Sequence, residues 1–202
     1  MASDALHRFR ESMQIDYEKW HDGIGYDLDA IDELDARGQK EAERLLIPRA
    51  GNDWRDLEAL DRLGTPGAVK AILDVRKKGS AEMRLRAYGY GPAAKESDWD
   101  SVIVDLLKVA KPYEGLTVAT SAALEHPSAA VVAELWRHVV SPSEIAYHAA
   151  ETLACIAGAS EDPYDFTHRP LLLRVQGPDT VERKAAVKEL QDLCAGTPGA
   201  CP

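Results

Sequence analysis

The densest group of side chains that could carry chemistry lies in the segment WHDGIGYDLD, residues 20–29. His21 beside Asp22, with Asp27 close by in sequence, has the residue types of a general base or a metal ligand oriented by a carboxylate. A metal site needs a second histidine or a cysteine at close spacing, and the segment has neither. Our first interpretation is therefore the end of a helix, with His21 near the last carbonyl groups, Trp20 buried, and Asp27 capping the next helix.

A protein-binding surface is the other interpretation of this segment. It would combine the aromatic, acidic and histidine side chains of the segment with a second triplet of aromatic, basic and acidic residues. The candidate partner-binding residues are Trp20, His21, Asp22, Tyr26, Asp27, Asp29, Trp54, Arg55 and Asp56.

The triplet Trp54, Arg55 and Asp56 invites comparison with HEAT-like DNA glycosylases, which place aromatic and acidic residues in a concave cleft. Such a cleft needs basic side chains on its wall to hold phosphate groups. The chain offers one group of this kind, with two tyrosines beside it: Lys70, Arg76, Lys77, Lys78, Arg84, Arg86, Tyr88 and Tyr90. We expect Arg55 and Asp56 to bond instead to a neighbouring repeat, and nucleic-acid chemistry is the second hypothesis.

No other motif indicates an enzyme. The sequence has no GxSxG, P-loop, GxGxxG or HExxH pattern. His148 shares a helical face with apolar residues and is expected in the interior, whereas His126 and His138 flank a helix and suggest end-capping. Serine and threonine nucleophiles cannot be ranked without geometry. We expect no catalytic residue, no metal and no cofactor.

The net charge and its distribution along the chain indicate which kind of partner the protein could bind. The formal net charge of −10 and the isoelectric point near 5.1 argue against a general nucleic-acid or anionic-membrane binder. The charge is banded, because residues 1–61 carry sixteen acidic and eight basic side chains, whereas residues 62–90 carry two and seven. We therefore expect a protein partner, most simply a basic one.

The cellular compartment is expected to be the cytoplasm. No apolar run approaches the roughly 20 residues that cross a bilayer, and the N-terminus has no apolar core of a secretory signal. Cys155 lies in an apolar helical run and is expected in the core, whereas Cys194 and Cys201 could pair, which is unusual in a reducing cytosol.

The helices that must position these residues are organised around a hairpin over residues 53–78. Asp53 is a suitable N-cap, Gly64 stops the first helix, Thr65 caps the second, and Pro66 occupies its first position. The apolar positions recur at helical spacing on both sides of the turn: Trp54, Leu57, Leu60 and Leu63, then Val69, Ile72 and Leu73.

Further helices follow from the same signals. We expect them over residues 3–21, 27–36, 39–49, 80–87, from a Ser97 cap, over 114–124 paired with 127–140, from a Ser141–Glu144 capping box to about Gly158, and from an Asp179 cap. The stretch 167–175 is ambiguous, because Leu171 to Val175 would suit a strand equally well by period, but the surrounding helices favour a helix. Leu6, Phe9, Met13, Tyr17 and Trp20 would share one face of the first helix. Residues 88–92 and 159–166 are expected to be loops.

Two segments, LGTPGAVKAIL from Leu63 and LEHPSAAVVAEL from Leu124, align through Pro66 and Pro127, about two repeat lengths of a helical hairpin apart. Together with residues 144–158 and 183–196, they resemble HEAT-like repeats of the phycobilisome-lyase type. The chain as a whole is also similar to bacterial HEAT-repeat proteins of unassigned role that have a WHDGxGYD-like N-terminal segment. The resemblance implies an architecture and leaves scaffolds, inhibitors and enzymes open.

The sequence therefore predicts an all-α fold, a right-handed α-solenoid of about ten helices in stacked HEAT-like hairpins. A single domain would span residues 1–202, with an atypical N-terminal cap over 1–50, repeats over 51–196 and a frayed tail over 197–202. The leading hypothesis is a non-catalytic protein-binding protein, comparable to bacterial immunity proteins or inhibitors that neutralise a basic toxin. The alternatives are a nucleic-acid enzyme or lyase-type protein that uses the concave face, and a self-associating scaffold.

Overall fold

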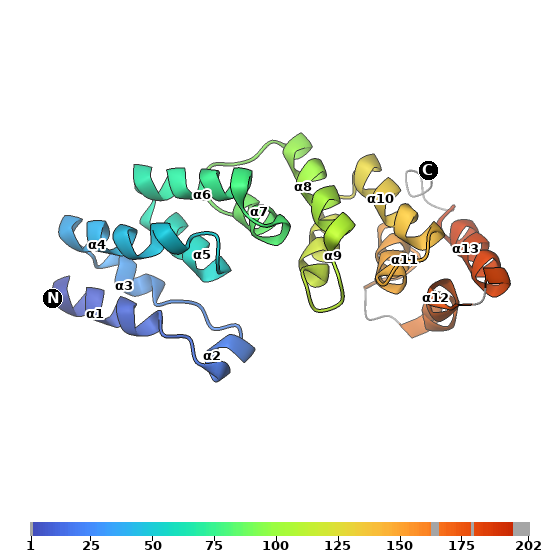
Figure 1. Cartoon of the computed structure of the whole chain (residues 1–202), viewed down its shortest axis with the longest axis horizontal. Coiled ribbons are helices and arrows are strands. Elements are labelled where there is room, and N and C mark those ends of the chain that lie inside the picture. The colour runs from blue at the N-terminus through green and yellow to red at the C-terminus, as the bar shows by residue number, and fades with distance from the viewer. Residues whose placement is uncertain (1, 163–165, 179, 196–202) are drawn as a thin grey trace. The chain divides into compact units, whose positions relative to one another are not determined.

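The computed structural model describes residues 2–162, 166–178 and 180–195. Within these ranges the chain forms thirteen α-helices, two short 3₁₀ helices and no β-sheet. Helices that follow one another in the chain pack as pairs (Figure 1). The all-α class predicted from the sequence is confirmed.

The helices gather into two compact units, Met1–Ala93 and Ala94–Pro202. The first unit contains α1 (Ala2–Ser12), α2 (Tyr17–His21), α3 (Leu28–Asp32), α4 (Ala36–Leu46), η1 (Ile47–Arg49), α5 (Trp54–Leu63), α6 (Pro66–Lys78) and α7 (Ala81–Tyr88). The second contains α8 (Glu96–Val109), α9 (Leu116–Glu125), α10 (Ala129–Val140), α11 (Ala146–Ile156), η2 (Phe166–His168), α12 (Arg169–Gln176) and α13 (Thr180–Cys194). The single domain, with its cap over residues 1–50 and repeats over 51–196, stays a prediction, and the tail over 197–202 lies outside the described residues.

The α5–α6 hairpin forms as its sequence predicts. Asp53 Oδ1 accepts a hydrogen bond from the Arg55 amide at 2.9 Å, and Thr65 Oγ1 accepts one from the Ala68 amide at 3.2 Å. Gly64 ends α5 with φ at 60°, in the left-handed region that glycine enters without strain. Local chemistry alone therefore sets the ends of both helices.

The core of the first unit lies where α5 meets its neighbours. Helices α3, α4, α6 and α7 all pack against α5, and α1 packs against α3 and α4. The largest fully buried side chains here are Phe9, Leu46, Leu57, Leu60 and Ile72. Burial of such a side chain stabilises the fold by about 1.5–3 kcal/mol. The central position of α5 decides which residues of the N-terminal segment can be buried.

The helix expected over residues 3–21 is interrupted, which corrects the prediction. Helix α1 ends at Ser12, whose hydroxyl donates to the Phe9 carbonyl at 2.7 Å and accepts from the Asp27 amide at 2.9 Å. Asp16 then caps a separate helix, α2, by accepting from the Lys19 amide at 2.9 Å. Because of this break, the apolar face that begins at Phe9 does not continue to Trp20.

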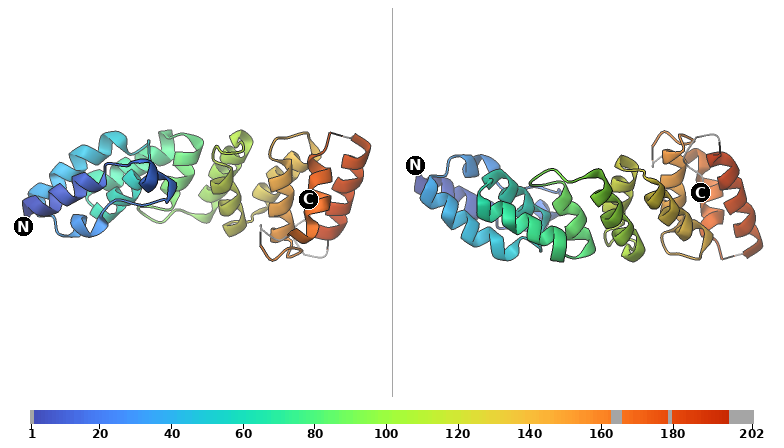
Figure 2. Two further views of the ribbon diagram at one scale, coloured as in Figure 1. Left: turned by 90° about the horizontal axis from the view of Figure 1, so that it is seen from below. Right: turned by 90° about the horizontal axis from the view of Figure 1, so that it is seen from above.

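The second unit pairs its helices in a way that differs from the prediction. Helix α9 packs against α8 and α11, and α10 packs against the same two helices, so 114–124 and 127–140 do not form an exclusive pair. Helices α10 to α13 lie side by side in chain order (Figure 2). Leu135, Ile145, Leu153, Leu172 and Leu190 are fully buried between them.

Several helix starts also differ from the prediction. Helix α4 begins at Ala36 after an Asp35 cap, earlier than expected, and α8 begins at Glu96, so that Ser97 lies inside the helix. The capping box at 141–144 is wrong, because α11 begins only at Ala146. The ambiguous stretch 167–175 is helical as favoured, and Asp179, the predicted cap of α13, lies outside the described residues.

Every helix in the described part of the chain is too short or too polar to span a bilayer. The cytoplasmic location stays a prediction.

The left-handed Gly64 offers a test of the hairpin. Replacing it with alanine should lower the free energy of unfolding by about 1 kcal/mol, because a Cβ disfavours a positive φ. Gly51→Ala is the matched control, since a Cβ there meets no atom within 4 Å and its φ lies outside the left-handed region. Urea unfolding of the two variants measures the difference; equal stability of the two would contradict the assigned turn.

Candidate functional site

Arg55 joins the N-terminal segment to α5. Its side chain is only 2% exposed, and its guanidinium donates to the backbone carbonyls of Ile24 at 2.6 Å and Lys19 at 3.2 Å. The Asp53 carboxylate lies 3.2 Å from the same guanidinium, which also lies over the Trp54 ring, 4.7 Å from its centroid. A buried cation is tolerated when its N–H groups are all engaged in this way. Arg55 thus fixes the irregular backbone around Gly23 against α5.

Asp56, the next residue, is fully buried. Its Oδ1 accepts a hydrogen bond from the Tyr26 hydroxyl at 3.0 Å and lies 3.4 Å from Arg49 Nε. Its Oδ2 is buried with no hydrogen-bond partner among the described residues. Burial raises the pKa of Asp56, and burial together with the nearby Asp56 charge raises the pKa of Tyr26. The pKa shifts of Asp56 and Tyr26 are therefore explained by burial and by the contact between the two side chains.

We expected Arg55 and Asp56 to bond to a neighbouring repeat; they bond within the first unit to residues 19–26 and Arg49, which the prediction assigned to the N-terminal cap. The polar atoms of Tyr26, Arg55 and Asp56 are therefore used inside the molecule. Trp54 is half-buried beneath the Arg55 guanidinium. The structure brings these four predicted site residues together, but in the interior of the first unit, where a partner would not reach the three that are buried.

The remaining predicted residues divide between structural and exposed positions. Asp27 caps α3 as expected, since its Oδ1 accepts from the Ala30 amide at 2.9 Å, whereas Asp29 is exposed. The His21 ring and the Asp22 carboxylate are exposed and lie 2.9 Å apart, Nδ1 to Oδ1. Trp20 is 64% exposed, which corrects the expectation that it would be buried.

Helix α2 carries an exposed aromatic cluster that we define as the α2 surface: Tyr17, Trp20, His21, Asp22 and Ile24. Tyr17 is 75% exposed, and its ring centroid lies 6.1 Å from that of Trp20 and 5.8 Å from that of His21. Tyr17 and Ile24 were not among the predicted site residues. The sequence signal that could have revealed them is Asp16, a good N-cap that divides the expected long helix.

The basic band over residues 62–90 is largely engaged within the first unit. Arg76 donates to the carbonyl groups of Ala87 and Pro92 at 3.0 and 2.7 Å, and Arg84 donates to the Arg76 carbonyl at 3.3 Å. Lys70 pairs with Asp74, and Arg86 pairs with Glu82. Lys77 and Lys78 are exposed at the end of α6. Arg76 and Arg84 thus hold the α6–α7 turn, and the engaged side chains of the band do not form a wall for phosphates.

Of two histidines in the second unit, His126 lies at a helix end as predicted, whereas His148 does not lie in the interior. His148 is 45% exposed and lies 3.5 Å from Glu151, so it is not an interior histidine. His126 is the C-cap of α9 and stacks on Trp99 with ring centroids 4.3 Å apart. Within the described ranges, no group of three or more histidine, cysteine or acidic side chains is arranged to hold a metal ion.

His138 is the buried titratable group of the second unit. Its Nδ1 lies 2.8 Å from Ser143 Oγ, and its Nε2 lies 3.4 Å from Glu134 Oε1 and 3.1 Å from Arg137 Nη2. Burial lowers the pKa of His138, and the Arg137 charge lowers it further. Serine, histidine and carboxylate are the types of a nucleophile relay, but Ser143 Oγ also accepts from the Ile145 amide at 3.3 Å. The cluster holds the α10–α11 turn.

The cysteines in the described part of the chain differ in how deeply they are buried. Cys194 is buried, Cys155 is half-buried, and Cys201 lies outside the described residues. The pairing considered for Cys194 and Cys201 therefore stays untested.

Comparisons with models of protein families, with curated proteins and with solved structures find no match to this chain. The HEAT-like resemblance therefore rests on the quoted residues and on the paired helices alone.

Tyr26→Phe should reduce the free energy of unfolding by about 1–3 kcal/mol, because it removes the only hydroxyl that donates to the buried Asp56 carboxylate. Tyr17→Phe is the matched control, since that ring is exposed and the loss of its hydroxyl should be neutral. Urea unfolding at pH 7 gives both values. Equal effects of the two changes would argue against the Tyr26–Asp56 bond.

His138 makes the stability depend on pH in a defined direction. Its pKa in the folded chain lies below the unfolded value of about 6.5, so its stabilising contribution is complete above about pH 6.5 and is lost as the pH falls through the folded pKa. The groups that face it are Glu134, Arg137, Ser143 and the Leu107 backbone. Between pH 7.5 and 5, His138→Gln should lose less stability than the wild type.

The pH prediction is measured by urea unfolding at several pH values. The difference in slope is at most about 1.4 kcal/mol per pH unit, the value for one proton. His7→Gln is the control for the replacement of an exposed histidine and is measured in the same way. A slope unaltered by His138→Gln would remove this residue from the acid response.

Proposed function

We propose that the chain is a non-catalytic protein-binding protein whose partner docks on the α2 surface. The observation that carries this proposal is the exposure of Tyr17 and Trp20 side by side on a short helix that is anchored from beneath by Arg55. Tyrosine and tryptophan are the residues most often found at the energetic centre of protein interfaces. A rigidly held aromatic pair loses little conformational entropy when it binds.

The charge around this pair indicates a basic partner. Asp16, Glu18 and Asp22 are all exposed on or next to α2, and Asp29 is exposed on α3. Acidic side chains around an aromatic centre speed association with a positively charged protein and oppose nucleic acid. Bacterial immunity proteins and inhibitors that neutralise a basic toxin are the class of binder that this combination suits, and the paired helices are consistent with HEAT-like repeats of the α-solenoid type.

A nucleic-acid or lyase-type enzyme is the second hypothesis of the sequence, and the observed contacts do not favour it. Asp56 is enclosed by Tyr26 and Arg49, and Arg76 and Arg84 bind backbone carbonyl groups. Self-association through the α2 surface is the third hypothesis. Light scattering at two protein concentrations separates it from a surface kept for another protein.

The test replaces both aromatic residues at once. The partner is first captured from the native host with the wild-type chain, purified, and titrated against variants by calorimetry. Tyr17→Ser with Trp20→Ser should weaken binding by at least about 30-fold, the effect of losing about 2 kcal/mol at an interface centre. Leu173→Ser on α12 is the matched control, because Leu173 is 53% exposed but lies in the second unit.

The proposal fails if the double variant binds the captured protein as tightly as the wild type, or if the wild type retains only nucleic acid or a small molecule. A partner that is itself acidic would contradict the charge argument alone. Circular dichroism of the double variant checks that the helices persist, as expected for two exposed side chains.

A further inference from the structure

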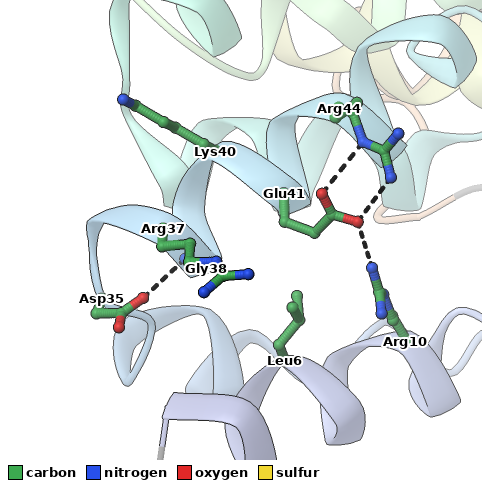
Figure 3. A pocket seen from close by; sticks show the side chains of 8 residues that line it. All are labelled: Leu6, Arg10, Asp35, Arg37, Gly38, Lys40, Glu41 and Arg44. Atoms are coloured by element: carbon green, nitrogen blue, oxygen red, sulfur yellow. Dashed lines mark hydrogen bonds and ion pairs between the residues drawn. The ribbon is translucent and has the colours of Figure 1, made fainter.

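A hollow of about 660 Å³ lies between α1 and α4, on the first unit (Figure 3). Its volume falls in the range of small-molecule sites, about 300–1,000 Å³. Its lining residues are Leu6, Arg10, Asp35, Arg37, Gly38, Lys40, Glu41 and Arg44. None of them belongs to the α2 surface, so the hollow is independent of the proposed function.

The charge of this lining is opposite to that of the region around it. Residues 1–61 contain twice as many acidic as basic side chains, yet four of their eight lysine and arginine residues line the hollow, with two acids. The local balance is therefore about two positive charges. In a region of net negative charge, this concentration of cations around one hollow favours the binding of an anion there.

The two acids of the lining are already engaged. Glu41 accepts from Arg44 at 2.8 and 3.1 Å and is also bonded to Arg10, and the Arg44 hydrogen bond is the main cause that lowers the pKa of Glu41. Asp35 Oδ1 accepts from the Gly38 amide at 2.8 Å as the cap of α4. Neither carboxylate is bonded to Arg37.

Arg37 is the cation of the lining that lacks a partner and faces the hollow. In the described part of the chain it makes no hydrogen bond or ion pair, and the same holds for Lys40. Figure 3 shows Arg37 extending from α4 into the space above Leu6, which Arg10 borders on the opposite side, whereas Lys40 points away. A group between Arg37 and Arg10 would meet two guanidinium groups and an apolar floor.

We propose that this hollow binds the phosphate group of a small phosphomonoester. A phosphomonoester carries about −1.5 to −2 charges at pH 7, which matches the local excess, and its three terminal oxygens can accept from both guanidinium groups at once. Arginine presents planar pairs of N–H donors that suit phosphate better than a lysine ammonium does. The organic part of the ligand rests on Leu6.

The surroundings of the hollow limit the ligand to a small one. Glu11, Asp32 and Glu33 are exposed on the flanking helices, so a polyanion that extended beyond the hollow would meet repulsion. Asp32 and Glu33 are paired with Arg62 and Arg8, which keeps those arginines from extending the basic area. Repulsion by these acidic side chains therefore disfavours a nucleic acid, whereas a compact dianion that fits inside the hollow avoids it.

The test uses phenyl phosphate, which combines a phosphate dianion with an apolar ring, on the full chain at low ionic strength. Calorimetry should show binding to the wild type and about tenfold weaker binding to Arg37→Gln, the loss expected for one charge-assisted hydrogen bond. Lys40→Gln is the matched control, because Lys40 is an unpartnered cation of the same lining whose side chain points away from the space between Arg37 and Arg10. It should weaken binding by less than about threefold, since only distant electrostatics change.

Amide NMR spectra locate the binding. Addition of phenyl phosphate should shift resonances of residues 6–10 and 35–44 and leave those of α2 unchanged. The proposal is overturned if the wild type shows no binding at millimolar phenyl phosphate, if Arg37→Gln and Lys40→Gln lose affinity equally, or if a 40-residue polyphosphate binds at the same residues more tightly than phenyl phosphate. Partner binding by the α2 surface would be unaffected by any of these results.

Discussion

The first unit depends on one buried cation, the guanidinium of Arg55. Residues 22–27 run without a helix between α2 and α3, and irregular backbone of this kind leaves carbonyl groups that need donors. Arg55 supplies them to Lys19 and Ile24, and Asp53 balances its charge. Because the polar backbone of this turn faces inward to α5, the side chains of Tyr17 and Trp20 are left on the outside. The exposed aromatic pair is a consequence of how the turn is anchored.

Several acidic side chains among the first 61 residues stabilise the fold itself. Asp16, Asp27, Asp35 and Asp53 each cap a helix, where a carboxylate accepts amide hydrogens and meets the positive end of the helix dipole. Asp56 is buried, with only one oxygen hydrogen-bonded, so it is a source of specificity for the Tyr26 contact more than of stability. The net charge of the sequence is therefore larger than the charge that a partner can meet, because some acidic side chains cap helices or are buried. The exposed acidic side chains near α2 are the ones that a partner would meet.

Sequence reasoning succeeded where the signals are local and failed where tertiary contacts compete with them. The α5–α6 hairpin follows from Asp53, Gly64, Thr65 and Pro66, all of which act within one helical turn. The box at Ser141–Glu144 has equally good local signals, but Ser141 is the C-cap of α10 and its carbonyl accepts from Arg183, so the next helix starts later. The α2 surface and the hollow beside Arg37 depend on which helices meet, and helical periodicity does not determine that. The charge bands along the chain do not indicate that four cations gather at one place.

The proposal of a binding protein is consistent with where burial shifts the pKa values of side chains. A catalytic acid or base combines an unusual pKa with access to a substrate. Burial shifts the pKa values of Tyr26, Asp56 and His138, and each of these side chains is enclosed by structural partners. The accessible groups are of another kind, an aromatic pair on α2 and an unpartnered arginine above Leu6. Both are suited to holding a molecule, the first through aromatic contacts and the second through its charge.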